Sequence, residues 1–292
     1  MYRKLLLSLI GSLIFSLSAT AAQFEDALGR HLTLHQAPQR ILSLVPAVTE
    51  ILFALGEAED IVAVTDYCTY PPAAKKLPKV GEYADPGLEN ILRFQPDLVF
   101  ASADMNRPAL VERLDALNIP VYVVYPHTVG ETLKTIRQIG QVTGAAIKAE
   151  NLAVGIEAQI ETLQKKIRGR KRPRILEVVI LHPITVAGPE TFVDDVIRLA
   201  GGENVVPSSP SRYPTWNPEA LLTADPEAII VSTYPGQPDP EQFFSQWPQL
   251  QAVKKRKIIH IEADWIHRPG PRMILGIKTL AKALHPDISL DE

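Results

Sequence analysis

The sequence predicts an α/β fold of two similar lobes with mostly parallel sheets, joined by a single long α-helix, with a ligand cleft between the lobes. Two observations support this prediction. Short apolar segments typical of strands alternate with helical segments along the chain, a pattern that indicates parallel sheets made from right-handed βαβ units. The same succession of segments also occurs twice with matching spacing, which indicates an internal repeat.

Residues 1–22 are predicted to be a cleavable signal peptide. Arg3 and Lys4 precede an apolar run over residues 5–17, and small residues follow, with Ala19 and Ala21 at a plausible cleavage motif. The apolar run is shorter than the ~20 residues that a membrane-spanning helix requires. No cysteine ends it, as one would in a lipoprotein. We therefore expect an exported chain that is not inserted in the membrane after cleavage.

Composition excludes several classes of protein. Loss of the two cations of the leader changes the net charge from −3 to −5, whereas nucleic-acid binding calls for a basic surface; no nucleic-acid partner is expected. Hydrophobic residues make up 46% of the sequence, enough for a packed core. Cys68 is the only cysteine, so no internal disulfide is possible. We expect a monomer.

Each half of the chain begins with a buried strand and a helix. The strands are predicted at 40–44 and 174–178, and the helices that follow end at Gly56 and Gly201. Glycine is the preferred residue just after a helix C-terminus because it adopts left-handed backbone angles without strain.

The second part of each half pairs a short helix with another strand. Glu89 stands seven residues before Pro96, and Glu219 stands seven residues before Pro226. Proline disfavours helix at the residue before it, so each short helix should stop there and lead into a buried β-branched strand. A further apolar strand closes each half.

Residues 128–171 carry no strand pattern and are predicted to be a helical linker between an N-terminal lobe, 23–127, and a C-terminal lobe, 172–292. Apolar residues recur at near-helical spacing over 145–167, and a helix of that length would extend ~35 Å. The run 165–174 contains seven basic residues, which we attribute to favourable interaction with the dipole at the helix C-terminus.

Common enzyme motifs are absent: the sequence has no Gly-x-Ser-x-Gly, no P-loop, no dinucleotide-binding glycine pattern and no His-Glu-x-x-His. The seven histidines are scattered without metal-ligand spacing. We therefore predict a binding protein with no catalytic residues, no resident metal and no catalytic cofactor. Two alternatives stay open: a periplasmic hydrolase with a nucleophile–base pair in the cleft, and a scaffolding module.

The chain resembles the helical-backbone (class III) solute-binding proteins of ABC importers, which carry cobalamin, haem and ferric siderophores. The segments that carry this resemblance are 26–30, 37–41, 46–51, 191–195 and 201–204. Within the family it is most similar to the periplasmic cobalamin-binding proteins, through 67–72, 81–89, 211–214 and 264–268. The resemblance covers essentially the whole mature chain. It implies a periplasmic location, a small-molecule ligand and, as partner, a permease dimer in the inner membrane.

The resemblance also implies ligand contacts from both lobes. They are Pro46, Ala47, Tyr67, Tyr83, Phe192, Tyr213, Asp264 and Arg268, with Trp216 as an adjacent candidate. Tyrosines supply flat contact area, while Asp264 and Arg268 could bond the amide edge of a corrinoid, a wide and flat macrocycle. The predicted ligand is therefore cobalamin or a related corrinoid.

Two departures from the cobalamin binders leave other ligands open. Tyr83 and Tyr213 stand where those proteins carry tryptophan, and Ser102 replaces an aromatic residue. Tyrosine and histidine can be axial ligands of haem iron, so a haem would be held by Tyr83, Tyr213 or His267. A ferric siderophore is the other alternative. Cys68 is expected to be a buried, unreactive thiol.

Glu89 and Glu219 correspond in the resemblance to the acids with which the family docks on arginines of the permease. The repeat places them at equivalent positions, one in each lobe, which suits a two-fold partner. The alternative is that each acid merely interacts with the dipole of its own helix.

We also expect the long helix to limit closure of the lobes around a ligand.

Overall fold

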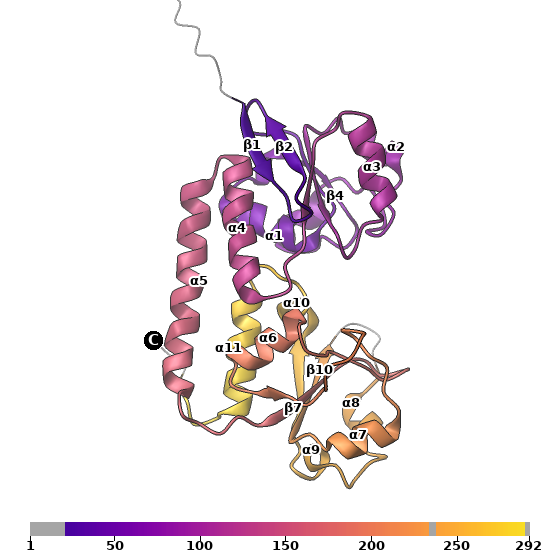
Figure 1. Ribbon diagram of the computed structural model, residues 1–292, viewed down its shortest axis with the longest axis vertical. Helices are drawn as coiled ribbons and strands as arrows, with labels where there is room; N and C mark the ends of the chain where they lie inside the picture. Colours follow the sequence, from indigo (N-terminus) through magenta and orange to yellow (C-terminus); the bar gives the residue numbers. More distant parts are fainter. Residues whose placement is uncertain (1–20, 234–237, 290–292) are drawn as a thin grey trace, which may run out of the picture.

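The computed structural model describes residues 21–233 and 238–289 and confirms the predicted fold of two α/β lobes. Figure 1 shows one lobe above the other, with the long helix α5 (Ala146–Ile167) running beside both on one side. None of the described helices is both long and apolar enough to cross a membrane.

The sheet of the N-terminal lobe has four parallel strands in the order β4-β3-β5-β6. They are β3 (Ile41–Ser43), β4 (Ile61–Val64), β5 (Leu98–Ser102) and β6 (Val121–Val124). Their residues are almost all buried, as expected for parallel strands that are covered on both faces. The helices of this lobe are α1 (Pro46–Leu55), α2 (Leu88–Leu92) and α3 (Pro108–Ala116), with short 3₁₀ turns at Ala58–Asp60 and Pro72–Lys76.

A hairpin of β1 (Ala22–Glu25) and β2 (His31–Leu34) precedes this sheet. Ala22 pairs with Leu34, so cleavage after Ala21 would leave the whole of β1 in the mature chain. Residues 1–20 of the predicted leader lie outside the described part of the chain.

The sheet of the C-terminal lobe has the order β11-β10-β7-β8, with β9 also paired to β7. Its strands are β7 (Arg174–Ile180), β8 (Thr185–Val186), β9 (Glu203–Asn204), β10 (Ala228–Thr233) and β11 (Ile258–Glu262). Only β8 runs antiparallel to its neighbour. The helices are α6 (Phe192–Leu199), α7 (Pro218–Ala224), α8 (Pro240–Phe244), α9 (Gln251–Lys254), α10 (Ala263–Ile266) and α11 (Met273–Leu284).

The internal repeat is visible in this arrangement. Helix α1 ends at Gly56 in left-handed backbone, φ 79°, and Gly201 takes a similar angle, φ 86°, just beyond α6. Helix α2 leads into β5, and α7 leads into β10, each through the proline that the sequence places before the strand. Helices α1 and α2 and strand β5 of one lobe thus correspond to α6, α7 and β10 of the other.

The linker forms two helices rather than one. Helix α5 (Ala146–Ile167) is the long helix that the sequence predicts, and α4 (Val129–Thr143), which the sequence analysis did not separate, packs against it. Their contact is close: a Cβ at Gly140 would lie 2.2 Å from the Cβ of Ala149. Helix α5 contacts both α1 and α11, and one continuous buried cluster includes residues of both lobes and both linker helices. The lobes thus share a core.

Candidate ligand-binding cleft

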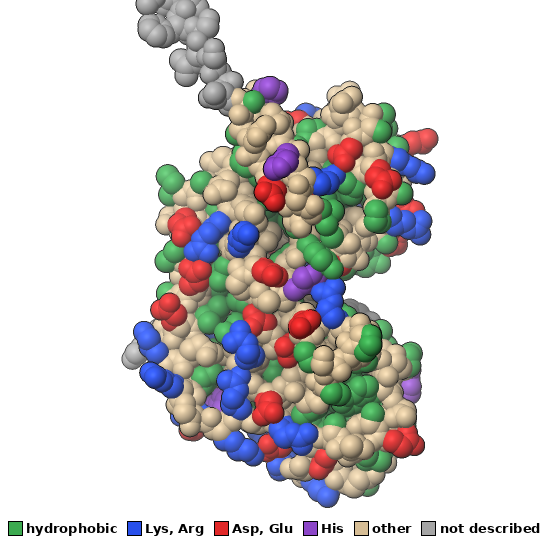
Figure 2. Space-filling model, in the orientation of Figure 1, with side chains coloured by type: hydrophobic (Ala, Val, Ile, Leu, Met, Phe, Trp, Pro, Cys, Tyr) green, Lys and Arg blue, Asp and Glu red, His purple; other side chains and the backbone are tan. Residues whose placement is uncertain are grey.

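A largely apolar cavity of about 340 Å³ lies between the lobes. The N-terminal lobe contributes Pro46 and Ala47 from the first turn of α1 and Tyr67 and Tyr83 from loops. The C-terminal lobe contributes the segment 263–269, which follows β11. Loops after the strands of an α/β sheet commonly carry binding residues, because the sheet holds them rigidly. Figure 2 shows the surface narrowing between the two lobes.

A second cavity of about 480 Å³ adjoins the first, and both are lined by Asp104, Pro126, His267 and Pro269. Phe192 and Tyr213 of the C-terminal lobe line the second cavity. The predicted ligand residues therefore converge on one composite cleft, with a single exception.

Trp216 lies outside the cleft. It lines neither cavity and packs instead against the buried cluster of the C-terminal lobe. Its backbone N–H donates to the carbonyl of Ile184 at 2.8 Å. Tyr213 and Trp216 are three residues apart in a segment that is hydrogen-bonded to residues 184–188, and in extended backbone an odd separation points the two side chains to opposite sides. Trp216 therefore does not line the cleft, and this geometry gives no support to its predicted ligand contact.

The tyrosines form an aromatic wall. The rings of Tyr67 and Tyr83 lie 5.5 Å apart at 44°. Tyr67 is 47% exposed, and its hydroxyl donates to Glu82 at 3.2 Å. The hydroxyl of Tyr83 donates to the sulfur of Met105 at 2.6 Å. Burial, with the charge of Asp104, raises the pKa of Tyr83 to about 12. Tyr83 therefore stays a neutral phenol at physiological pH.

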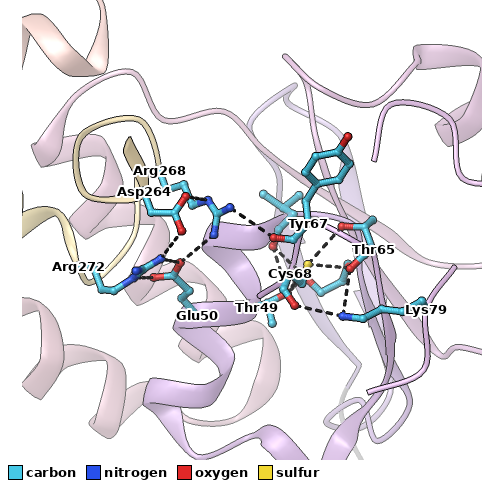
Figure 3. Close-up of polar contacts among 11 residues, drawn as sticks. Thr49, Glu50, Thr65, Tyr67, Cys68, Lys79, Asp264, Arg268 and Arg272 are labelled. Carbon is cyan, nitrogen blue, oxygen red and sulfur yellow. Dashed lines mark hydrogen bonds and ion pairs between the residues drawn. The ribbon is translucent and has the colours of Figure 1, made fainter. Parts of the chain in front are cut away.

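An ion cluster joins the lobes beside this wall (Figure 3). Arg272 donates to both carboxylate oxygens of Glu50 at 2.8 and 2.6 Å and to Asp264 at 3.0 Å. Arg268 pairs with Asp264 at 2.9 Å, and the guanidinium of Arg272 lies 4.0 Å from the centre of the Tyr70 ring. Glu50 and Tyr70 belong to the N-terminal lobe and the other three residues to the C-terminal lobe, so the cluster bridges the cleft.

Asp264 and Arg268, which the resemblance assigns to the ligand, thus line the cavity and also hold the lobes together. The Nη1 atom of Arg268 is buried, makes no hydrogen bond within the described residues and lies 3.6 Å from Glu50. A buried donor without a partner is costly. The nearby carboxylate of Glu50 offsets part of this cost, and the Arg268 side chain lines the cavity.

His267 has buried partners. Its Nε2 lies 2.5 Å from the hydroxyl of Ser232 and 3.1 Å from Glu177, which also accepts from Ser232 at 2.9 Å. Ser232 and His267 are 35 positions apart, so no local motif predicts this serine–histidine pair. Ser232 is only 1% exposed, and the nitrogen that would accept its proton is shared with Glu177. The hydroxyl is not presented to the cleft, so the pair does not support a hydrolase.

The thiol of Cys68 is fully buried, as expected. Its sulfur lies 3.1 Å from the hydroxyl of Thr49 and 3.3 Å from that of Thr65 (Figure 3). No group of three His, Cys, Asp or Glu residues with metal-binding geometry occurs within 21–233 and 238–289.

Glu89 and Glu219 line neither cavity and lie in the first turns of α2 and α7. Both are exposed. Figure 1 places α2 and α7 on different lobes, on the side of the molecule opposite α5.

The sequence pattern of the periplasmic binding protein family matches residues 41–265. The chain belongs to this family. It is 29% identical over 255 residues to the vitamin B12-binding protein of Photorhabdus laumondii subsp. laumondii, covering 87% of this chain and 90% of that protein. The family and these relatives are binding proteins rather than enzymes.

Solved structures show the same fold. The vitamin B12-binding protein BtuF of Vibrio cholerae matches with a TM-score of 0.76 and 26% identity, covering 85% of this chain and 96% of that one. The haem-binding protein RhuT of Roseiflexus sp. RS-1 matches with a TM-score of 0.77 and 27% identity, covering 85% and 98%. The chain is therefore a class III periplasmic binding protein of the ABC-importer type, with a small-molecule ligand and a permease partner.

Proposed function

We propose that this protein binds cobalamin or a related corrinoid in the cleft between its lobes and delivers it to the permease of an ABC importer. The observation that carries the proposal is the apolar cavity walled by Tyr67 and Tyr83, with polar groups of Asp264 and Arg268 at one edge. A flat macrocycle needs such aromatic area, and its amide rim needs a few oriented donors and acceptors. The relatives named as vitamin B12-binding proteins support the same ligand.

The test is calorimetric titration of residues 23–292 with cyanocobalamin. We expect one-to-one binding, weakened roughly ten- to hundredfold in Tyr83→Ala and in Tyr213→Ala, since each loses the burial of an aromatic side chain. Trp216→Phe is the matched control, because Trp216 lies outside both cavities, and its affinity should equal that of the unaltered protein. Absence of cyanocobalamin binding would refute the ligand, and unchanged affinity in both tyrosine variants would refute the cleft.

Haem is the second candidate, because His267 lines both cavities and a haem-binding protein shares the fold. Burial raises the pKa of Tyr83 and of Tyr213, which opposes the loss of the phenolic proton that iron ligation would require. His267 keeps Nδ1 as its remaining nitrogen. Haemin and a ferric siderophore are titrated in parallel. Haemin binding with a Soret shift that is lost in His267→Gln, together with silence toward cyanocobalamin, would replace the corrinoid by haem.

We also propose that Glu89 and Glu219 dock on the permease dimer. Both are exposed, and neither forms an ion pair with another described residue, so both are available to arginines of a partner. The double variant Glu89→Arg/Glu219→Arg should abolish uptake and keep ligand affinity. Glu59→Arg/Glu112→Arg, which reverses two other exposed acids, is the control. Undiminished uptake by the first double variant would remove the docking assignment.

The family supports a periplasmic location, and we propose the following organisation of the chain. The leader is 1–22, the lobes are 23–127 and 172–292, the helical linker is 128–171, and the mature chain is a monomer without a lipid anchor. Mass spectrometry of the exported protein tests the leader: a mass that begins at Ala22 or Gln23 supports it, and a lipid-modified or uncleaved chain contradicts it.

A further inference from the structure

The two halves of the cleft differ in chemistry. The first cavity is apolar and walled by Tyr67 and Tyr83, whereas the second is lined by Arg212, His127 and Asp104. Arg212 comes from the C-terminal lobe and reaches the loop after β6 in the N-terminal lobe. None of these polar residues belongs to the ligand contacts that the sequence analysis names.

Neutral groups hold the guanidinium of Arg212. Its Nη1 donates to Nδ1 of His127 at 2.7 Å, and its Nη2 donates to the hydroxyl of Tyr125 at 3.0 Å. Because arginine has no acceptor, His127 accepts at Nδ1 and is therefore neutral in this arrangement. The guanidinium has five N–H donors, and these two bonds leave the others for a further partner.

The charge of Arg212 is not balanced by a bound carboxylate. Over 21–233 and 238–289, no carboxylate oxygen lies within 4.0 Å of its nitrogens. Arg268 and Arg272, the other arginines of the cleft region, both pair with carboxylates. Arg212 thus presents a positive charge to the cavity that a ligand could neutralise.

Asp104 is the acid that lines this cavity. Burial raises its pKa above the usual value, although the positive charge of Arg212 opposes that shift. Its carboxylate lies near the two side chains without forming an ion pair to Arg212. An anionic group that enters the cavity would compete with Asp104 for the field of Arg212.

We propose that Arg212 and His127 form an anion subsite, which holds a negatively charged oxygen group of the ligand while the tyrosines hold its macrocycle. The inference rests on the proposed function. In a corrinoid the group is the phosphodiester of the nucleotide tail, and in a haem it is a propionate; the guanidinium recognises either by charge-assisted hydrogen bonds.

The test compares two corrinoids that differ in this group. Cyanocobalamin carries the phosphodiester, and dicyanocobinamide lacks the nucleotide tail. Arg212→Gln should lower the affinity for cyanocobalamin about ten- to hundredfold, the effect of losing a hydrogen bond to a charged group, and leave that for dicyanocobinamide unchanged. Asp104→Asn should raise the affinity for cyanocobalamin alone. Arg113→Gln, at an exposed position of α3, should change neither.

Each other outcome counts against the subsite. Arg212 also ties the lobes together, and if that were its only role, Arg212→Gln would weaken both corrinoids equally. Unchanged cyanocobalamin affinity would also overturn the inference. If haemin binds and cyanocobalamin does not, the proposed ligand is wrong. The subsite is then tested by comparing haemin with its dimethyl ester. Arg212→Gln should lower the affinity for haemin and leave that for the ester unchanged. Binding of neither would refute both proposals.

Discussion

Substitution of Glu50 should show how much the ion cluster between the lobes adds to the free energy of unfolding, beyond what the shared core contributes. The residue is 4% exposed, and its carboxylate accepts two hydrogen bonds from Arg272 and a longer contact from Arg268. Glu50→Gln keeps the shape of the side chain and removes its charge. Asp264 would then face two guanidinium groups alone.

Removal of one partner from a buried ion pair costs about 3–5 kcal/mol, because the remaining charge is left without compensation. Arg272 is 14% exposed and stacks on Tyr70, and Asp264 still binds it, so we expect a loss near the lower end, about 3 kcal/mol. The charge of the arginine persists: burial lowers its pKa, but the hydrogen bonds and charges of Glu50 and Asp264 outweigh that effect and raise it. Against the ~5–15 kcal/mol typical of a folded domain, the variant should still fold.

Urea unfolding followed by fluorescence measures the free energy of unfolding of each variant. Arg137→Gln is the matched control, since Arg137 is 28% exposed and pairs with Glu150 and Glu157, which are 54% and 39% exposed. A surface pair of this kind contributes about 0–1 kcal/mol. If Glu50→Gln and Arg137→Gln lowered the free energy of unfolding equally, the ion cluster would not stabilise the junction, and the core alone would hold the lobes.

Three other predictions test the linker, the thiol and the aromatic wall. Gly140→Ala should lower the free energy of unfolding by about 1–3 kcal/mol, because its Cβ would overlap that of Ala149. Gly155→Ala should raise it by roughly 0.5–1 kcal/mol, because a Cβ there meets nothing within 4 Å. Urea unfolding measures both variants, and equal effects would contradict the close packing of α4 on α5. Cys68 should react with a thiol reagent at the rate of unfolding, and fast labelling of the native protein would contradict its burial. The pKa of Tyr83 is about 12 in the folded protein and about 10 in the unfolded chain. The unfolded chain therefore loses the phenolic proton first, and the free energy of unfolding should fall as pH rises from ~10 to ~12. Tyr83→Phe should reduce this dependence on pH, and an identical dependence in urea unfolding would argue against a buried phenol.

Much of the fold could be predicted because its signals are local. Strand β3 and helix α1 follow from an apolar run and a terminal glycine, and both recur in the second half. Helix α4 had a comparable signal that was not used. Thr128 caps it by accepting from the N–H of Glu131 at 3.0 Å, and Gly144 closes it with φ 83°. The boundary between the two linker helices was therefore readable from the sequence.

The cleft was only partly predictable, since its residues meet through the packing of distant segments. Tyr67 and Tyr83 could be named because the resemblance marks them and each stands in a loop beside a strand. Arg212 and His127 are 85 positions apart and belong to different lobes, so no local spacing connects them. No role is predicted for Glu50 from the sequence, because its partner Arg272 lies 222 positions away. Residues whose roles depend on the relative placement of the lobes are those that a single sequence does not reveal.

The same contacts explain why the cleft should already be formed before a ligand arrives. Helix α5 packs on both lobes, and a continuous buried cluster runs between them. Arg272 is hydrogen-bonded to Glu50 at one side of the cleft, and Arg212 is hydrogen-bonded to His127 at the other. Opening the lobes would break buried ion pairs and expose apolar surface, both of which cost free energy. Arg268 is held by Asp264 with one nitrogen unbonded, so little side-chain ordering remains to oppose binding. The cleft is thus preorganised, and this lowers the free-energy cost of binding.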